Sequence, residues 1–354
     1  MRIDLGRLRR VLAVRLDNAG DVVMLGPALR ALRQALPRAR ITLLCSPAGS
    51  QVAPLLPWVD EVAVASSVSW QDASGNLPQD PVRERALIDR LAAGRFDAAF
   101  VFTSWAQSPH PPAYACYLAG IPIRVGESKE FAGSILSHAV PSLPDSAHQV
   151  DRNLHLVTSV GIAPAGTDLE LRVPAAAACS AAALLRGVGA VGTTGGSYAV
   201  LAPGASCPSR RYPPERFAQI ARGLDLPAVV VGSAREAGLA TVIQAAAPHV
   251  RALTGRTTMP ELAAVIAGAA LIVTNNSAPM HLADALRRPL VALFAGTELE
   301  SQFAPRTAPR RVLRRPTGCA PCHAFTCAFD LECLDVPPAQ VVRAGQEVME
   351  ALSR

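Results

Sequence analysis

The chain has very little lysine and few aromatic residues. Lys129 is the single lysine among 34 basic residues, and Phe, Trp and Tyr make up 5% of the 354 residues. With so few rings to stack on bases, and with no nucleic-acid-reading motif, we expect no nucleic-acid partner. The net charge of +6 indicates anionic partners, but it does not separate phosphorylated metabolites from a lipid surface.

Long apolar runs are also missing. The longest, residues 262–273, falls well short of the roughly 20 residues that a membrane-spanning helix needs. The amino terminus, Met-Arg-Ile-Asp-Leu-Gly-Arg, is too charged for the apolar core of a signal peptide. We therefore expect a cytoplasmic protein. Neither a Walker A loop nor a G-x-G-x-x-G motif follows an expected strand, which argues against P-loop ATPases and ordinary dehydrogenases.

Short apolar runs alternate with helical patterns along the whole chain, which predicts an α/β fold with parallel sheets. The expected strands cover residues 11–14, 41–45, 61–65, 97–103, 198–202, 227–231, 250–253, 270–274 and 289–294. The expected helices include residues 82–93, 113–119, 235–246, 260–268 and 277–286, and a helix on which Leu25, Leu29, Leu32 and Leu36 form one stripe. The prediction is two facing, Rossmann-like, doubly wound domains with a central cleft.

The domain boundaries follow from a change in composition. Alanines give way to glycines between residues 174 and 197, which predicts a flexible connection. We therefore expect an N-terminal domain over residues 1–173, a linker over 174–197, a second domain over 198–335 and a C-terminal helix over 336–354.

Three strand-to-helix turns carry polar residues, and ligands of open α/β sheets bind at such turns. In the first turn, Gly20 permits a tight bend and Asp21 falls in the first turn of the helix. Asp21 is either a helix cap or a general base for a bound hydroxyl, and Asp17 is a second candidate for the base.

The second turn, residues 203–214, combines Gly204 and Ser206 with the paired arginines Arg210 and Arg211. Backbone N–H groups and guanidinium groups in such a loop suit a phosphate, although a solvated loop has the same composition. In the third turn, residues 274–281, Ser277 is a good N-cap and His281 lies one helical turn further along. A helix start of this kind favours an anion.

Together these turns resemble glycosyltransferase family 9, the heptosyltransferases of lipopolysaccharide core assembly. The resemblance runs from residue 11 to about residue 341. It rests on Arg15 and the Gly-Asp-Val of residues 20–22, the Pro-Gly-Ala of residues 203–205, Arg210 before Tyr-Pro, Gly232 with Glu236, and residues 276–281. It implies a GT-B fold, and inverting, metal-independent transfer of a sugar from a nucleotide-diphosphate donor such as ADP-heptose.

The resemblance also implies roles for individual residues. Asp21 matches the base that deprotonates the acceptor hydroxyl, and Arg15 and Asp17 are candidates for acceptor or cleft contacts. The donor would be held by Ser206, Arg210, Glu236, Asn276, Ser277, Ala278 and His281, with Glu236 at the nucleoside. The acceptor would be a lipopolysaccharide core or another cell-envelope glycan, reached at the cytoplasmic face of the inner membrane with peripheral membrane contact. The resemblance further implies that catalysis requires no cofactor.

Three residues depart from the family pattern. Asn276 stands where the family usually has Asp, Ala278 where it has Gly, and Arg210 where it often has Lys. Asparagine keeps an acceptor oxygen but carries no charge, and Ala278 narrows the approach of the backbone to a ligand. These departures keep two alternatives open: a nucleotide-sugar 2-epimerase-like enzyme, and a non-catalytic relative that binds sugar nucleotides.

Four cysteines gather near the end of the chain, at positions 319, 322, 327 and 333. Thiolates this close suit a structural zinc or iron ion, so Cys319, Cys322, Cys327 and Cys333 are candidate metal ligands. Their spacings match no common zinc module, and unpaired cysteines or disulfides are the other interpretations.

Overall fold

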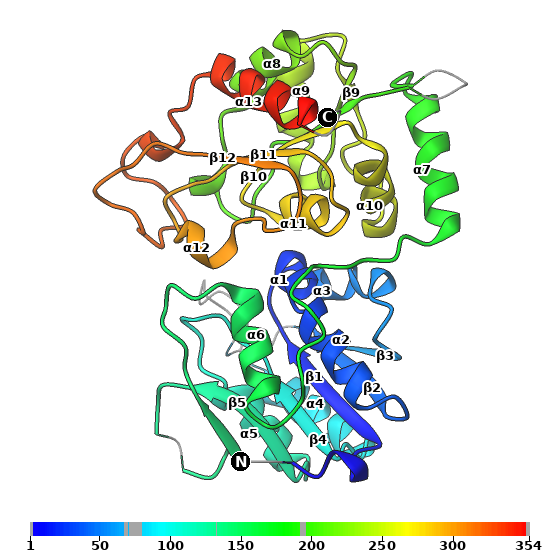
Figure 1. Cartoon of the computed structure of the whole chain (residues 1–354), viewed down its shortest axis with the longest axis vertical. Coiled ribbons are helices and arrows are strands. Elements are labelled where there is room, and N and C mark those ends of the chain that lie inside the picture. The colour runs from blue at the N-terminus through cyan, green and yellow to red at the C-terminus, as the bar shows by residue number, and fades with distance from the viewer. Residues whose placement is uncertain (1–2, 67–69, 71–79, 132, 192–195, 352–354) are drawn as a thin grey trace. The chain divides into compact units, whose positions relative to one another are not determined.

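The computed structural model describes residues 3–66, 70, 80–131, 133–191 and 196–351. Contacts divide the chain into an N-terminal unit, Met1–Glu170, and a C-terminal unit, Leu171–Arg354. Each unit contains one six-stranded sheet, and every strand pair within the two sheets is parallel (Figure 1). Within the described ranges, no helix is both long and apolar enough to cross a bilayer.

The sheet of the N-terminal unit has the strand order β3-β2-β1-β4-β5-β6. Its strands are β1 (Arg10–Arg15), β2 (Arg40–Cys45), β3 (Glu61–Val64), β4 (Ala98–Val101), β5 (Ile123–Ser128) and β6 (His138–Pro141). β1, β2 and β4 are almost entirely buried because helices cover both faces.

Helices pack on both faces of this sheet. One face carries α4 (Pro81–Ala93) and α5 (His110–Leu118), whose apolar residues form a core with Leu12 and Val14 of β1. The other helices are α1 (Ala19–Met24), α2 (Gly26–Ala35), α3 (Pro47–Ser50) and α6 (Gln149–Thr158), and α2 packs against α6 (Figure 1).

The sheet of the C-terminal unit has the strand order β12-β11-β10-β7-β8-β9. Its strands are β7 (Ala199–Ala202), β8 (Ala228–Val230), β9 (Arg251–Ala252), β10 (Leu271–Asn275), β11 (Leu290–Leu293) and β12 (Arg310–Leu313). Counted from the first strand of each unit, the two sheets have the same order, so both are doubly wound in the Rossmann manner.

Its helices are α7 (Ala175–Gly187), α8 (Pro214–Gly223), α9 (Ala237–Ala246), α10 (Met259–Gly268), α11 (Ala278–Ala285), α12 (Glu300–Phe303) and α13 (Pro338–Glu350). One core joins α8, α9 and α13 to the sheet, with Phe217, Ile243 and Val341 all fully buried. α7 and α11 both pack against α10 (Figure 1).

The predicted α/β class with two doubly wound domains is confirmed, and each strand expected from the sequence is present. Leu25, Leu29, Leu32 and Leu36 are buried as the stripe predicts, but the helix begins earlier and consists of α1 and α2. The stretch expected as a flexible linker contains the alanine-rich helix α7, and residues 192–195 of that stretch lie outside the described residues.

Candidate active site

Each sheet has one point where the strand order reverses, and the polar turns follow the strands that flank it. In the N-terminal unit this point lies between β1 and β4, and in the C-terminal unit between β7 and β10. Ligands of doubly wound folds bind beside such switch points, at the carboxyl ends of the strands. The turns singled out in the sequence begin at these strand ends.

Arg15, the last residue of β1, is fully buried and joins two carboxylates. Its Nε lies 2.8 Å from Oδ2 of Asp17, and its Nη2 lies 3.0 Å from Oδ1 of Asp21. The same Nη2 donates to Oγ of Ser104, which follows β4, at 2.9 Å. The structure therefore brings together the three candidate residues of the first turn, and adds Ser104 from the neighbouring strand.

Asp17 is the more enclosed of the two carboxylates. Burial raises its pKa above the usual value, and the charge of Asp21 raises it further, whereas Arg15 and a hydrogen bond from Gln107 lower it. A guanidinium between two carboxylates compensates charges that would be costly to bury alone. Arg15 and Asp17 thus lie beneath the turn and hold its conformation.

Asp21 occupies the third position of α1 and closes a capping box with the N-cap residue Asn18. The Asn18 N–H donates to Oδ2 of Asp21 at 3.2 Å, while Oδ1 faces Arg15. The cap expected from the sequence is present. About one sixth of the side chain stays exposed (16%), and each carboxylate oxygen has a second lone pair, so a bound hydroxyl can also reach it.

In the C-terminal unit, the buried Asn275 links the two strand ends at the switch point. Its Nδ2 donates to the carbonyl of Pro203 at 2.7 Å, and its Oδ1 accepts from the N–H of Tyr212 at 3.1 Å. The loop after β7 is thereby fixed to the end of β10. Sequence reasoning did not identify Asn275, because only the fold brings residues 203 and 275 together.

Arg210 is held on the side of β11. Its Nε donates to Oγ1 of Thr297 at 2.9 Å, and its Nη2 forms an ion pair with Oε1 of Glu298 at 2.5 Å. The other oxygen of Glu298 accepts from Nδ2 of Asn276 at 3.1 Å. Ser206, the exposed end of this group, accepts a long hydrogen bond of 3.5 Å from Arg210 Nη1. Two of the predicted donor residues, Arg210 and Asn276, thus meet at Glu298, which the sequence did not reveal, and Ser206 is joined to them through Arg210.

Glu236 lies across two glycines. Its Oε2 accepts hydrogen bonds from the N–H and hydroxyl of Ser233, at 2.7 and 3.0 Å. A Cβ added at Gly204 would come within 1.9 Å of Oε1, and one added at Gly232 within 2.9 Å of Oε2. Both glycines are therefore needed for the observed position of this carboxylate.

The third turn opens α11. Ser277 is the N-cap residue, as predicted, but its hydroxyl donates back to the Asn275 carbonyl at 3.4 Å instead of capping the helix. Ala278 begins the helix and is half-buried. His281 is buried, and burial lowers its pKa to about 4 despite the opposing effect of Asp284, so its imidazole is neutral at pH 7.

The four candidate metal ligands are free thiols. Burial raises the pKa of Cys333, and the charges of the other three cysteines raise it further, so the four thiols lie in one neighbourhood. In the part of the chain that the structure covers, however, no three His, Cys, Asp or Glu side chains are grouped so that they could hold a metal ion. The donor set suits a metal by its chemistry, so a structural metal at these cysteines stays a prediction from the sequence.

The cysteine segment packs on the loop that follows β11 and on the turn that contains Ser209. The N–H groups of Cys322 and His323 donate to the carbonyls of Gly296 and Thr297, at 2.9 and 3.1 Å. Ser209 bonds to the segment through its hydroxyl, which donates to the Ala324 carbonyl. The segment therefore forms a wall beside Arg210.

Helix α6 was not predicted from the sequence. Its buried polar side chains bond to the segments that follow β4 and end α1, next to the turn that contains Asp21. Gln149 donates to the carbonyl of Thr103 at 3.1 Å, and Asn153 donates to the carbonyl of Met24, the last residue of α1, at 3.1 Å. Arg152, between them, forms a buried ion pair with Glu127 at the end of β5. The buried apolar residues of α6, Val150, Leu154 and Val157, lie at helical spacing and were the sequence signal that could have predicted this helix.

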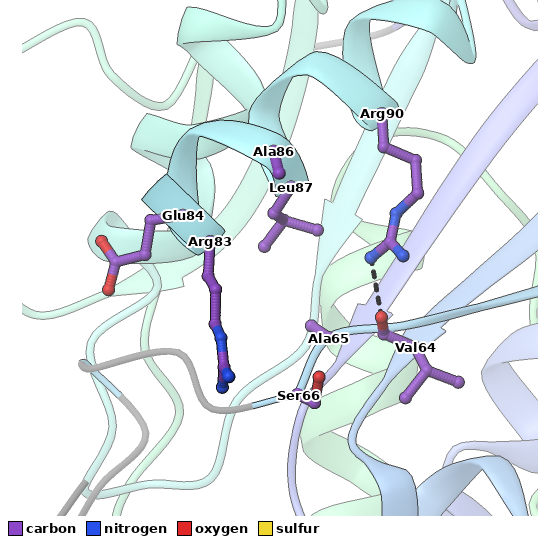
Figure 2. Close-up of a pocket in the computed structure, with 8 residues that line it drawn as sticks. All are labelled: Val64, Ala65, Ser66, Arg83, Glu84, Ala86, Leu87 and Arg90. Carbon is purple, nitrogen blue, oxygen red and sulfur yellow. Dashed lines mark hydrogen bonds between the residues drawn. The ribbon is translucent and has the colours of Figure 1, made fainter. Parts of the chain in front are cut away.

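Two pockets lie within the N-terminal unit. One, of about 270 Å³, lies between the end of β3 and α4, where Arg90 donates to the Val64 carbonyl at 2.7 Å and Arg83 extends towards Ser66 (Figure 2). The other, of about 300 Å³, lies at the ends of β4 and β5 and includes Ser104 and Gln107. The second pocket adjoins the cluster of Arg15, Asp17 and Asp21, because Ser104 bonds to Arg15 and Gln107 bonds to Asp17.

The fold and these turns define an α/β protein with polar turns at the switch points of two Rossmann-like sheets. The sequence model of glycosyltransferase family 9 (heptosyltransferase) matches residues 84–332. The chain belongs to this family and is a glycosyltransferase.

Curated relatives and solved structures agree with this assignment. Lipopolysaccharide heptosyltransferase 2 of Escherichia coli K12 is 29% identical over 330 residues, which cover 87% of this chain and 89% of the relative. The structure of E. coli ADP-heptose lps heptosyltransferase II has a TM-score of 0.77 at 23% identity, covering 98% of this chain and all of that one. A family 9 glycosyl transferase from Veillonella parvula has a TM-score of 0.78 at 21% identity, covering 99% of both chains. The expected GT-B fold is confirmed.

Proposed function

We propose that the protein transfers a heptose from ADP-heptose to a hydroxyl of a lipopolysaccharide core acceptor, with inversion at the anomeric carbon. The observation that carries the proposal is the Asp21 carboxylate, fixed by Arg15 at the switch point of the N-terminal sheet. Two relatives, lipopolysaccharide heptosyltransferase 2 and ADP-heptose lps heptosyltransferase II, support the choice of donor and acceptor by the activities in their names.

In the proposed reaction Asp21 accepts the proton of the acceptor hydroxyl as its oxygen attacks the anomeric carbon. The bond from that carbon to the diphosphate oxygen breaks, and the nucleoside diphosphate leaves with the bonding electrons. Arg210 and the N–H groups at the start of α11 stabilise the charge that develops on the leaving group. With this charge stabilisation, the proposed reaction requires no metal ion.

The remaining donor residues have complementary roles in this proposal. Glu236 accepts hydrogen bonds from the ribose hydroxyls, while Ser206 and Ser277 contact the diphosphate. The neutral His281 packs beneath the turn that holds the donor.

The test is a transfer assay with ADP-heptose and a heptose-deficient lipopolysaccharide core, run with and without EDTA. Asp21→Asn should lose at least 100-fold in kcat while the Kd for ADP-heptose changes less than threefold. Activity of Asp21→Asn near that of the unmodified protein would exclude Asp21 as the base. Loss of activity in EDTA would exclude metal-independent transfer. Donor conversion without acceptor would favour an epimerase.

We also propose peripheral binding to the cytoplasmic face of the inner membrane, where a lipid-linked acceptor is found. The supporting feature is one face of α5, on which Tyr114, Tyr117 and Leu118 are each about half exposed. Amphipathic aromatic side chains favour the membrane–water interface. Co-flotation with anionic vesicles, weakened in Tyr114→Ser/Tyr117→Ser, would support this, and equal flotation of the variant would refute it.

A further inference from the structure

The pocket at the ends of β4 and β5 is lined mainly by polar side chains and by one aromatic ring. Its volume is about 300 Å³, near the lower limit for small-molecule sites. Ser104, Trp105 and Gln107, which follow β4, form one wall, and Glu127 with Arg152 lies on the side of β5 and α6. All of these residues belong to the N-terminal unit.

Glu127 is the most informative residue of the pocket. It is buried, and its Oε1 accepts from Arg152 and from the N–H of Leu143. Its Oε2 is also shielded from bulk water, yet it has no hydrogen-bond partner among the residues that the structure describes. Leaving a buried carboxylate oxygen without a donor is costly, so a donor brought in by a bound molecule would be stabilised there.

The charges around the pocket favour an uncharged ligand. Arg152 is occupied, with Nη1 on Glu127 and Nη2 on the Pro144 carbonyl, and Lys129 is paired with Asp145. The unpartnered oxygen of Glu127 repels phosphates and carboxylates but accepts from hydroxyl groups. The Lys129 ammonium lies 5.6 Å from the centre of the Trp105 ring, which limits the movement of that ring.

The wall of the pocket is bonded to the group that holds Asp21. Ser104 accepts from Nη2 of Arg15, the nitrogen that also pairs with Asp21, and Gln107 donates to the carboxylate of Asp17. A ligand in this pocket is therefore separated from the Asp21 carboxylate by a single layer of side chains.

From these observations we propose that this pocket binds an uncharged sugar ring of the acceptor, with its hydroxyls on Glu127 and Ser104 and its apolar face on Trp105. The inference rests on the proposed function for the identity of the ligand as acceptor. Its binding test, however, involves no catalysis.

The test measures sugar binding by saturation-transfer NMR, with methyl α-mannopyranoside as the uncharged ring and mannose 6-phosphate as its anionic counterpart. We expect transfer to the methyl glycoside with a millimolar Kd, binding of the phosphate at least tenfold weaker, and loss of both signals in Trp105→Ala. Trp105→Phe should restore binding to within threefold. Arg83→Ala, in the other pocket of the same unit, serves as the matched control and should bind normally.

Glu127→Gln tests the carboxylate, with the thermal unfolding midpoint monitored because the buried pair with Arg152 is lost. Ser104→Ala tests the same ring without touching that pair, so the proposal stays testable if Glu127→Gln fails to fold. In transfer assays both variants should raise the acceptor KM at least tenfold and leave the KM for ADP-heptose within twofold.

Several results would overturn the proposal. Stronger binding of the phosphate would make the pocket an anion site. Undiminished binding in Trp105→Ala would place the sugar elsewhere. No sugar binding, together with an unchanged acceptor KM in Ser104→Ala, would show that only water fills the pocket. Asp21→Asn should still bind the glycoside, so a failure of the proposed base and a failure of this site give different results.

Discussion

Asn276 and Glu298 are joined by a hydrogen bond of 3.1 Å from the amide nitrogen to Oε2, while the other oxygen of Glu298 pairs with Arg210. The family resemblance placed a negative charge at position 276, where this chain has an uncharged amide. The structure places a carboxylate next to that amide, at position 298. The departure at 276 therefore coincides with an acidic group supplied by another turn.

This pairing predicts that Asn276→Asp is harmful, although it restores the residue usual in the family. The new carboxylate would lie about 3 Å from Glu298, and like charges at this distance should weaken donor binding by about 1–3 kcal/mol. Calorimetric titration of ADP-heptose measures the loss. Glu298→Gln in the same chain should recover at least half of it, and a strictly additive double-mutant cycle would show that the two residues do not interact.

Arg15 should be essential for the stability of the N-terminal unit. Arg15→Met leaves Asp17 and Asp21 without their shared cation, and the loss of one partner of a buried pair costs about 3–5 kcal/mol. Urea unfolding measures this loss, and adding Asp17→Asn should recover part of it.

The control for Arg15 is Arg83→Met. It removes an exposed pair with Asp80, which is worth less than about 1 kcal/mol. Equal losses in the Arg15 and Arg83 variants would contradict the role of burial.

His281 should make the C-terminal unit sensitive to acid. Its pKa falls from 6.5 to about 4 on burial, so the fold favours the neutral ring. The stability that this preference contributes is fully present above pH 6.5, and it is lost as the pH falls towards 4. The loss in the free energy of unfolding reaches about 3 kcal/mol. His281→Gln should flatten the dependence of unfolding free energy on pH between 7 and 4. A slope unchanged from that of the native chain would mean that other groups cause it.

Gly204→Ala should weaken nucleotide binding with little effect on folding. The added Cβ meets the Glu236 carboxylate, the mobile end of a side chain, which can move aside. We expect the Kd for ADP-heptose to rise at least tenfold, the unfolding midpoint to stay within a few degrees, and Gly204→Ala to add nothing in a Glu236→Ala background. Gly238→Ala, in open space on α9, should leave binding unchanged.

Much of the fold could be predicted because its strands are short apolar runs at α/β spacing. The elements that were not predicted, such as β5 and α6, have polar or charged residues at buried positions, so their apolar pattern is incomplete. β5 contains the buried Arg124 and Glu127, so it does not appear as an apolar run, and α6 buries Gln149, Arg152 and Asn153. A pattern of apolar residues does not detect elements whose buried positions are polar.

The candidate site shows the same limit. The turns at Asp21, Arg210 and Asn276 follow predicted strands, so the topology alone places them near switch points. Their partners, Ser104 and Glu298, belong to other turns without any motif of their own. Only the order of strands in the sheet makes them neighbours.

Helix α6 has a consequence for how this sequence can change over evolutionary time. Its polar residues serve three neighbours at once: Gln149 the loop after β4, Arg152 the end of β5, and Asn153 the end of α1. Replacing any of them with an apolar residue leaves a buried group without its partner, at a cost of about 1–3 kcal/mol or more. Substitutions here are therefore accessible only alongside changes in the elements they serve. Across related sequences, α6 and these three strand and helix ends should vary together.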